Sequence, residues 1–166
     1  MKPFSENIIF IDTEFSTIDP YKGEILSIGL VKLDGGELYL ELEYEGEVSE
    51  WVKENIIPTL KNEKVSREDA KRKIKEFVGN NKPYAVGFVN QFDTLYIYKL
   101  FGIDKHPFYW LPIDFASILF SNGIDPEKNL VESNEAAKEL GIDVSKYKEH
   151  HALDDANLLR EVYFKC

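Results

Sequence analysis

Two carboxylates near the start of the chain have the types and spacing of a metal site. The stretch Ile9–Phe15 leads from an apolar run into Asp12, Thr13 and Glu14, and such a run is typical of a buried strand. Side chains alternate along a strand, so Asp12 and Glu14 project from the same face. In a low-dielectric interior the two acids repel each other unless a cation lies between them. The alternative is a strand that runs into solvent with both acids hydrated, so further ligands must come from elsewhere in the chain.

Two later segments carry further acids. Asp93 follows a short apolar run, Tyr84–Val89, at the start of an expected helix, which is where open α/β sheets place their sites. Near the end of the chain, His150–Asp155 combines two imidazoles and two carboxylates around another helix start. Taken alone, Asp93 fits a helix cap, and the closing segment fits an acid-rich helix start beside an exposed His pair. The combination and order of the three segments favour a shared site.

The elements expected to position these residues form a mixed α/β sheet with helices on its faces. An antiparallel meander of three strands comes first, over Asn7–Asp12, Glu24–Leu33 and Glu37–Tyr44. Two more strands are expected at Tyr84–Val89 and Phe108–Ile113. Apolar spacing and cap residues predict helices at Glu50–Ile57, Ser66–Val78, 91–100, Phe115–Ser121, Asn134–Leu140 and His150–Lys165. No linker divides the chain, so residues 1–166 are expected to form one domain.

The composition is that of a folded globular protein, with 43% apolar and 30% charged residues. No run approaches the ~18 apolar residues of a membrane helix, and residues 1–7 lack the apolar core of a signal peptide, so no membrane partner is expected. The single cysteine, Cys166, leaves no internal disulfide, and a cytoplasmic location is the simplest expectation. The formal net charge of −10 argues against broad binding to duplex nucleic acid. It leaves room for a local site in which bound cations reverse the field.

Together, Asp12-x-Glu14, Asp93 after Phe92, and His150 with Asp155 resemble the three motifs of the DEDDh superfamily of 3′–5′ exonucleases. The motifs occur in the same order and span nearly the whole chain. The resemblance implies an RNase H-like fold and hydrolysis of phosphodiester bonds from the 3′ end. Further stretches are similar to the adenosine-specific 3′–5′ exoribonucleases of the mycobacterial type: Asp12–Phe15, Leu26–Val31, Trp51–Leu60 and the segment from Phe92 to Gly102.

The resemblance also implies a metal site and a general base. Four carboxylates would hold two Mg²⁺ ions, for which Mn²⁺ would substitute: Asp12, Glu14, Asp93 and Asp155. Two ions roughly 3.5–4 Å apart would clamp the scissile phosphate, activate the attacking water and stabilise the leaving 3′ oxygen. His150 would be the general base, a role that suits the usual imidazole pKa of about 6.5. The sister group with a Tyr uses the position that His151 occupies here, so His151 is the alternative.

The implied substrate is single-stranded nucleic acid, with RNA favoured over DNA. Phe15, Thr13 and Phe92 lie beside the acids and are the candidate substrate contacts, because stacking on aromatic rings contributes about 1–3 kcal/mol per base. For both phenylalanines, core packing is the alternative. Related exoribonucleases are often homodimers, so a homodimer is expected from the resemblance alone.

Two departures from the superfamily pattern bear on substrate choice. Val89 stands where many members carry an Asn, and Asn90 comes one place later. Residues 15–17 replace a stretch that usually consists of small residues. Both positions affect substrate contacts more than metal binding, so the hydrolytic chemistry is expected to be unchanged.

Four functions stay open at this point. The first is a 3′–5′ exoribonuclease, and the second is the same chemistry on DNA in proofreading or repair. The third is a catalytically silent nucleic-acid-binding domain, which the presence of all five expected catalytic residues argues against. The fourth is a calcium-binding acidic domain, but no loop has EF-hand spacing.

Overall fold

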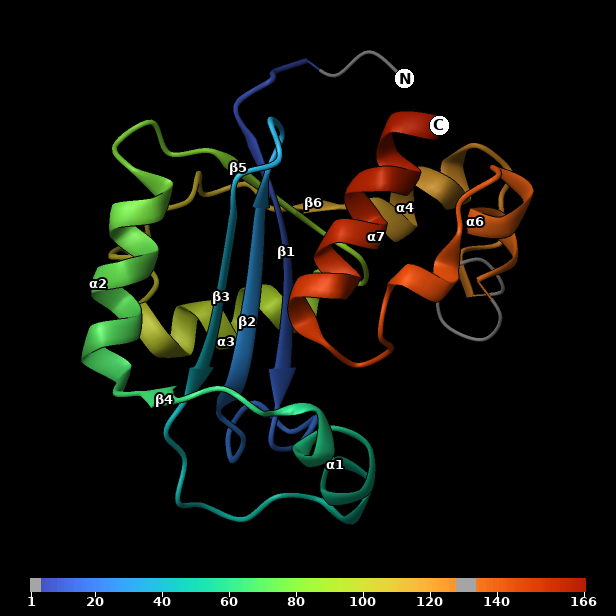
Figure 1. The fold of residues 1–166 in the computed structure, drawn as a ribbon. Coiled ribbons are helices and arrows are strands. Elements are labelled where there is room, and N and C mark those ends of the chain that lie inside the picture. Colours follow the sequence, from blue (N-terminus) through green and yellow to red (C-terminus); the bar gives the residue numbers. More distant parts are fainter. Residues whose placement is uncertain (1–3, 128–133) are drawn as a thin grey trace.

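A mixed β-sheet forms the centre of the molecule. The structure, a computed structural model, describes residues 4–127 and 134–166. In this part of the chain six strands pair in the order β4-β3-β2-β1-β5-β6 (Figure 1). Their bounds are β1 Ile8–Phe15, β2 Ile25–Lys32, β3 Glu37–Leu42, β4 Lys64–Val65, β5 Tyr84–Gly87 and β6 Ile113–Asp114. β1, β2 and β3 form an antiparallel meander, and β5 and β6 continue the sheet in parallel with β1. The mixed α/β sheet expected from the sequence is thereby confirmed.

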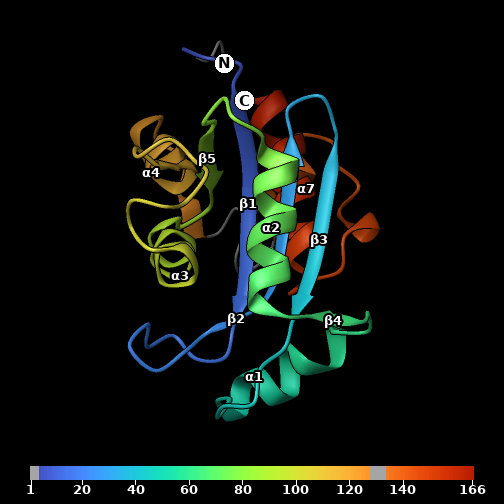
Figure 2. The same cartoon turned by 90° about the vertical axis from the view of Figure 1, so that its left-hand side faces the viewer.

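Helices cover both faces of this sheet. α2 (Arg67–Val78) and α3 (Gln91–Phe101) lie on one face, as Figure 2 shows for α2. On the other face, α7 (Ala152–Lys165) crosses β1 and β2, with α4 (Phe115–Ser121) and α6 (Glu135–Glu139) beside it (Figure 1). α1 (Glu50–Asn55) and the 3₁₀ turn Ile57–Thr59 lie beyond the end of the meander. A second 3₁₀ turn, Val144–Lys146, precedes α7.

The alternation of side chains along β1 produces two separate cores. Ile9 and Ile11 pack against α2 and α3, whereas Ile8 and Phe10 pack against α4 and α7. Continuing the same alternation places Asp12 and Glu14 on the side of α7. The sequence pattern had predicted that the first strand ends at Asp12, but β1 continues to Phe15 because β2 remains paired with it. Both acids therefore lie within a paired strand.

Other predicted elements and boundaries also differ from the structure. The strand predicted at Phe108–Ile113 is wrong, because only Ile113–Asp114 pairs with β5; Pro112 has no N–H to donate to a ladder. β4 was not predicted, since its two residues carry no periodic signal. The last helix begins at Ala152 rather than His150. Among the described residues, no helix has both the length and the apolar character needed to cross a membrane.

Candidate active site

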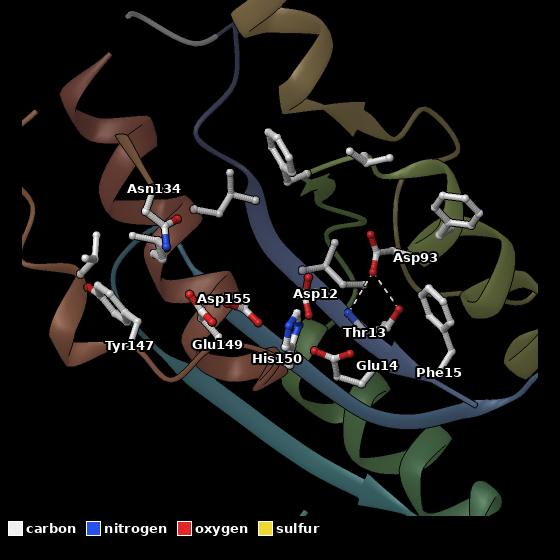
Figure 3. A pocket seen from close by; sticks show the side chains of 17 residues that line it. Asp12, Thr13, Glu14, Phe15, Asp93, Asn134, Tyr147, Glu149, His150 and Asp155 are labelled. Atoms are coloured by element: carbon white, nitrogen blue, oxygen red, sulfur yellow. Dashed lines mark hydrogen bonds between the residues drawn. The ribbon is translucent and has the colours of Figure 1, made fainter. Parts of the chain in front are cut away.

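Three of the predicted metal ligands meet at the middle of the sheet. β1 supplies Asp12 and Glu14, and the first turn of α7 supplies Asp155. One carboxylate oxygen from each of these residues lies within 4.8 Å of the others. Figure 3 shows the three side chains converging on one space. Asp155 is far from Asp12 and Glu14 in the sequence, so the convergence of the three acids depends on how closely α7 approaches β1 and β2.

A glycine in β2 allows this approach. Gly29 lies directly opposite Asp12 in the sheet, and a Cβ built on Gly29 would lie 2.2 Å from the backbone oxygen of Ala152. The first turn of α7 therefore rests on the bare backbone of β2. Ala152 and Ala156 are fully buried, and their small side chains let this helix lie close to the sheet.

Gly29→Ala is expected to impair both folding and the site. The added methyl group collides with backbone rather than with a flexible side chain, so α7 must move away from β2. Overpacking of this kind destabilises proteins by about 1–3 kcal/mol, and here it also carries Asp155 away from Asp12. Chemical denaturation and a divalent-cation titration measure the two effects. Gly36→Ala, at a hairpin position where a Cβ would meet its nearest atom at 3.4 Å, is the matched control and should change cation affinity little.

Asp93 lies beside the part of β1 that β5 leaves unpaired. β5 pairs only with Ile8–Phe10 of β1, so the N–H of Thr13 needs another acceptor. Asp93 Oδ1 accepts hydrogen bonds from the Thr13 backbone N–H at 2.8 Å and from its hydroxyl at 2.7 Å (Figure 3). Asp93 lines the same cavity as the cluster but is not one of its three members. The Thr13 hydroxyl thus holds Asp93, and its role as a substrate contact stays a prediction.

Burial and mutual repulsion make the four carboxyl groups reluctant to ionise. Burial raises the pKa of Glu14 to about 8, and the charges of Asp155 and Asp93 add to this. Burial also raises the pKa of Asp93 to about 7, against the opposing hydrogen bonds from Thr13, and that of Asp155 to about 7. The pKa of Asp12 is raised well above its usual value, first by burial and then by all three neighbouring acids.

This donor set fits a divalent cation. Its members are hard oxygen ligands, which Mg²⁺ and Mn²⁺ prefer. They lie so close together that their ionised carboxylates repel one another. A cation among them would favour the ionised forms and remove the repulsion. Strongly shifted carboxyl pKa values in a cavity are also typical of functional sites.

The shifted pKa values predict a pH-dependent stabilisation by metal. An unfolded carboxyl group titrates at about 4, so between about pH 4 and pH 8 the folded metal-free protein binds more protons than the unfolded chain. The contribution of these groups to stability is therefore complete below about pH 4 and is lost as pH rises to about 8. Mg²⁺ is expected to raise Tm more at pH 8 than at pH 5.5, measured by differential scanning fluorimetry against EDTA. An equal shift at both pH values would contradict the assignment.

His150 reaches the same cavity from the connection that precedes α7. Its backbone φ is +56°, in the left-handed region that few non-glycine residues adopt. Figure 3 shows its imidazole beside Asp12 and Glu14. His151 lies elsewhere: its ring packs 4.4 Å from the Tyr39 ring, and its Nδ1 lies 3.3 Å from Asp154. His151 does not line the cavity, whereas His150 does.

Phe15 and Phe92, the two candidate base contacts, both line the cavity. The Phe15 ring stacks on Tyr96 with centroids 4.5 Å apart and an angle of 13° between the planes. Phe92 lies 6.0 Å from Phe15. Both rings are half-buried, and Phe15 also packs against the core beneath α3. Each therefore presents one part to the core and another to the cavity, and their contact with a base stays a prediction.

The shifted asparagine is a structural residue. Asn90 is buried, and its side-chain amide donates to the backbone oxygens of Ala85 and Ile113. Val89, at the position where many superfamily members have an Asn, lines the cavity with φ of +55°. Asn90 thus joins β5 to β6 and does not replace the missing side chain at the cavity.

The cavity itself has a volume of about 290 Å³. Several of its residues were not among the predicted site residues: Phe88, Val89, Asn134, Val144, Tyr147, Glu149, Leu158 and Leu159. No motif marks them, because they reach the cavity from the turn after β5, from the irregular segments before α6 and α7, and from α7 itself. Asp114 and Asp154 accept hydrogen bonds from the backbone N–H groups of Ser117 and Lys148.

Comparison with known proteins relates this architecture to exonucleases. The zinc-bound form of the *E. coli* exonuclease I–ssDNA complex has a TM-score of 0.70 at 14% identity, covering 94% of this chain and 39% of that chain. Exonuclease I from Methylocaldum szegediense has a TM-score of 0.67 at 13% identity, covering 95% of this chain and 39% of that chain. A chain in the structure of the yeast NOT1 MIF4G domain co-crystallised with CAF1 has a TM-score of 0.59 at 12% identity, covering 96% of this chain and 80% of that chain. At these identities the likeness concerns the fold.

This chain spans about two fifths of the length of the exonuclease I chains that it matches. No relative is found among curated protein sequences. The family model described as Exonuclease (RNase_T) matches residues 9–163, which include both ends of the site from Asp12 to Asp155. The chain therefore belongs to the RNase_T exonuclease family.

Proposed function

We propose that this protein is a metal-dependent 3′–5′ exoribonuclease that releases nucleoside 5′-monophosphates from the 3′ end of single-stranded RNA. The observation that carries the proposal is the cluster of Asp12, Glu14 and Asp155 with His150 beside it. A hydrolase acting on a phosphodiester needs cation ligands and a group that takes a proton from water. This cavity offers both at one point.

Asp12, Glu14 and Asp155 would hold the cations, with Asp93 at the edge of the same cavity. Mg²⁺ is the proposed ion, and Mn²⁺ is expected to substitute because it has the same preference for oxygen ligands. When bound, the cations supply charge neutralisation of the phosphate and acidification of the attacking water. Thr13 keeps Asp93 in place through two hydrogen bonds, and His150 accepts the proton of the water at an imidazole nitrogen.

The open, half-polar cavity suits a single-stranded end. Phe15 and Phe92 offer aromatic rings at its wall, where a terminal base would stack. With a net charge of −10, the protein attracts phosphate weakly away from the cations, so stacking would supply much of the affinity. The structures of *E. coli* exonuclease I with a dA16 and a 5cy-dT13 oligonucleotide support a single-stranded substrate for this fold.

Those same structures favour a second candidate, a 3′–5′ exodeoxyribonuclease, because their oligonucleotides are DNA. RNA is proposed first because several stretches resemble the adenosine-specific exoribonucleases. The test compares RNA, DNA and an RNA ending in one 2′-deoxynucleotide, all of one sequence. Faster hydrolysis of all-RNA, and slowing by the single terminal deoxynucleotide, are expected, since the 2′-OH distinguishes the sugars. Faster hydrolysis of DNA would replace the proposal by the second candidate.

Adenosine preference and a homodimer belong to this proposal on resemblance alone. An oligo(A) substrate hydrolysed faster than oligo(U) and oligo(C) of the same length is the expected result for the base preference. Light scattering coupled to size-exclusion chromatography is expected to give the mass of a dimer, twice the 19.2 kDa of one chain.

A further inference from the structure

We infer that Trp51 and Thr59, both outside the cavity, are positioning residues that hold His150 in its catalytic orientation. The inference rests on the proposed function, because it concerns the residue proposed to act as general base. It gives a role to the segment Trp51–Leu60, which is one of the stretches that resemble the adenosine-specific exoribonucleases. No residue of this segment belongs to the metal site.

His150 lacks the usual means of orienting a catalytic histidine. A catalytic base is normally held by a third group that hydrogen-bonds to its far side. Neither ring nitrogen of His150 has a hydrogen-bond or ion-pair partner within residues 4–127 and 134–166. Within the described residues, the contacts of His150 that can orient the imidazole are ring packing and hydrogen bonds to its backbone.

Trp51 supplies the packing. The ring centroids of Trp51 and His150 lie 5.0 Å apart, with the planes at 81°, an edge-to-face arrangement that aromatic pairs favour. Trp51 does not line the cavity, so it contacts the imidazole from outside the space that the substrate would fill. The indole thereby restricts rotation of the His150 side chain without occupying the site.

The helix that carries Trp51 is itself fixed to the sheet. Val52 of α1 and Ile56, the C-cap of this helix, are buried against Leu26 of β2. The N–H of Ser49, the N-cap of α1, donates to the backbone oxygen of Ser16 just after β1. α1 is therefore tied to the same two strands that carry and support Asp12 and Glu14. Because α1 is fixed in this way, the contact between the Trp51 and His150 rings also fixes the position of the imidazole.

Thr59 supplies the backbone anchor. Its hydroxyl lies 3.1 Å from the His150 carbonyl oxygen and 2.8 Å from the Ile56 carbonyl oxygen, so it can donate to either acceptor. On the other side of the peptide, the His151 N–H donates to Asp155 at 3.1 Å. A left-handed residue persists only where its surroundings determine it. These two hydrogen bonds hold the peptide between His150 and His151 and connect the His150 conformation to a metal-ligand candidate.

A double-mutant cycle tests the inference in the full-length chain. Trp51→Ala is expected to lower kcat about 10- to 100-fold, because a displacement of about 1 Å at a catalytic group has effects of that size. KM should stay within about two-fold, and Trp51→Phe should restore most of kcat. In a His150→Ala background, Trp51→Ala should have no further effect, because its only task is gone. Thr59→Val should behave in the same way with a smaller loss.

The chain offers a matched control. Trp110, the other of its two tryptophans, is 68% exposed against 53% for Trp51 and does not line the cavity. Trp110→Ala should leave kcat unchanged. If Trp51→Ala lowers the rate by the same factor with and without His150, or acts on KM alone, Trp51 contacts substrate directly and the inference is overturned.

NMR of the imidazole separates this inference from the proposed function. The chain has three histidines, so the Cε1–H signal of His150 can be assigned by substitution in the metal-free protein. Trp51→Ala should move that signal toward its random-coil position through loss of the indole ring current, whereas Trp110→Ala should not. An unmoved signal in Trp51→Ala overturns the inference whatever the activity. Absence of nuclease activity in the wild-type chain, with the signal moving as expected, would contradict the proposed function and leave the positioning contact in place.

Discussion

Asp12→Asn is expected to lower kcat by about 10³-fold or more. Asp12 lies at the centre of the acidic cluster, since Asp155, Asp93 and Glu14 all raise its pKa. Removing its charge would deprive the proposed cations of a central ligand, and the electrostatic stabilisation that such cations supply amounts to several kcal/mol, or about a thousand-fold in rate. Single-turnover measurement of 3′-end hydrolysis at saturating Mg²⁺ gives the loss directly.

The same substitution should not unfold the protein. It removes a buried acid that burial and three neighbouring carboxylates destabilise in its charged form, so metal-free Asp12→Asn should be more stable than wild type at pH 8. Loss of activity together with increased Tm in EDTA is the expected combination. Asp104→Asn, in an exposed turn away from the cavity, is the control. Near-normal turnover by Asp12→Asn would contradict the metal-site assignment.

His150→Ala is expected to lower kcat about 10²- to 10⁴-fold, the usual contribution of a positioned general base. Its imidazole points into the cavity beside the acids (Figure 3), but it is not one of the three clustered oxygen donors. Mg²⁺ affinity measured by calorimetry should therefore stay close to that of wild type. This separates the loss of a proton acceptor from the loss of the metal site.

His151→Ala provides the matched comparison. Its ring packs against Tyr39 and lies beside Asp154, outside the cavity. We expect a modest loss of stability and a much smaller change in kcat than for His150→Ala. A larger loss of kcat in His151→Ala would mean that the motif is read one residue out of register and that the Tyr-type arrangement describes the site better.

Most of the site residues could be predicted from the three motifs and their spacing. Asp12 and Glu14 share a face of β1 because strand periodicity requires it, and the helical start after His151 brings Asp155 toward them. The meander was also predictable, since its turn and its apolar alternation are local properties. The shared face of β1 and the meander depend on neighbours in sequence, which is why the sequence could reveal them. Asp155 was assigned to the site through the resemblance to the exonuclease motifs.

What the sequence could not reveal depends on contacts across the fold. β1 continues past Asp12 only because β2 pairs with it to Phe15. The left-handed His150 depends on Thr59, which is 91 residues away. Asn90 comes one place after the position of the usual Asn, and only the fold shows that its side-chain amide donates to the backbone oxygens of Ala85 and Ile113. Each of these features depends on a segment that is distant in the sequence and adjacent in the fold.

The measurement that tests the central claim most directly follows a 5′-labelled single-stranded RNA of mixed sequence with Mg²⁺. A label at the 5′ end reports shortening from the 3′ end as a ladder. We predict a ladder that shortens progressively, that EDTA abolishes, that Mn²⁺ restores and that Asp12→Asn does not produce. An intact RNA and an intact matched DNA with either metal, or a ladder that persists in EDTA, would contradict the metal-dependent 3′–5′ exonuclease described here.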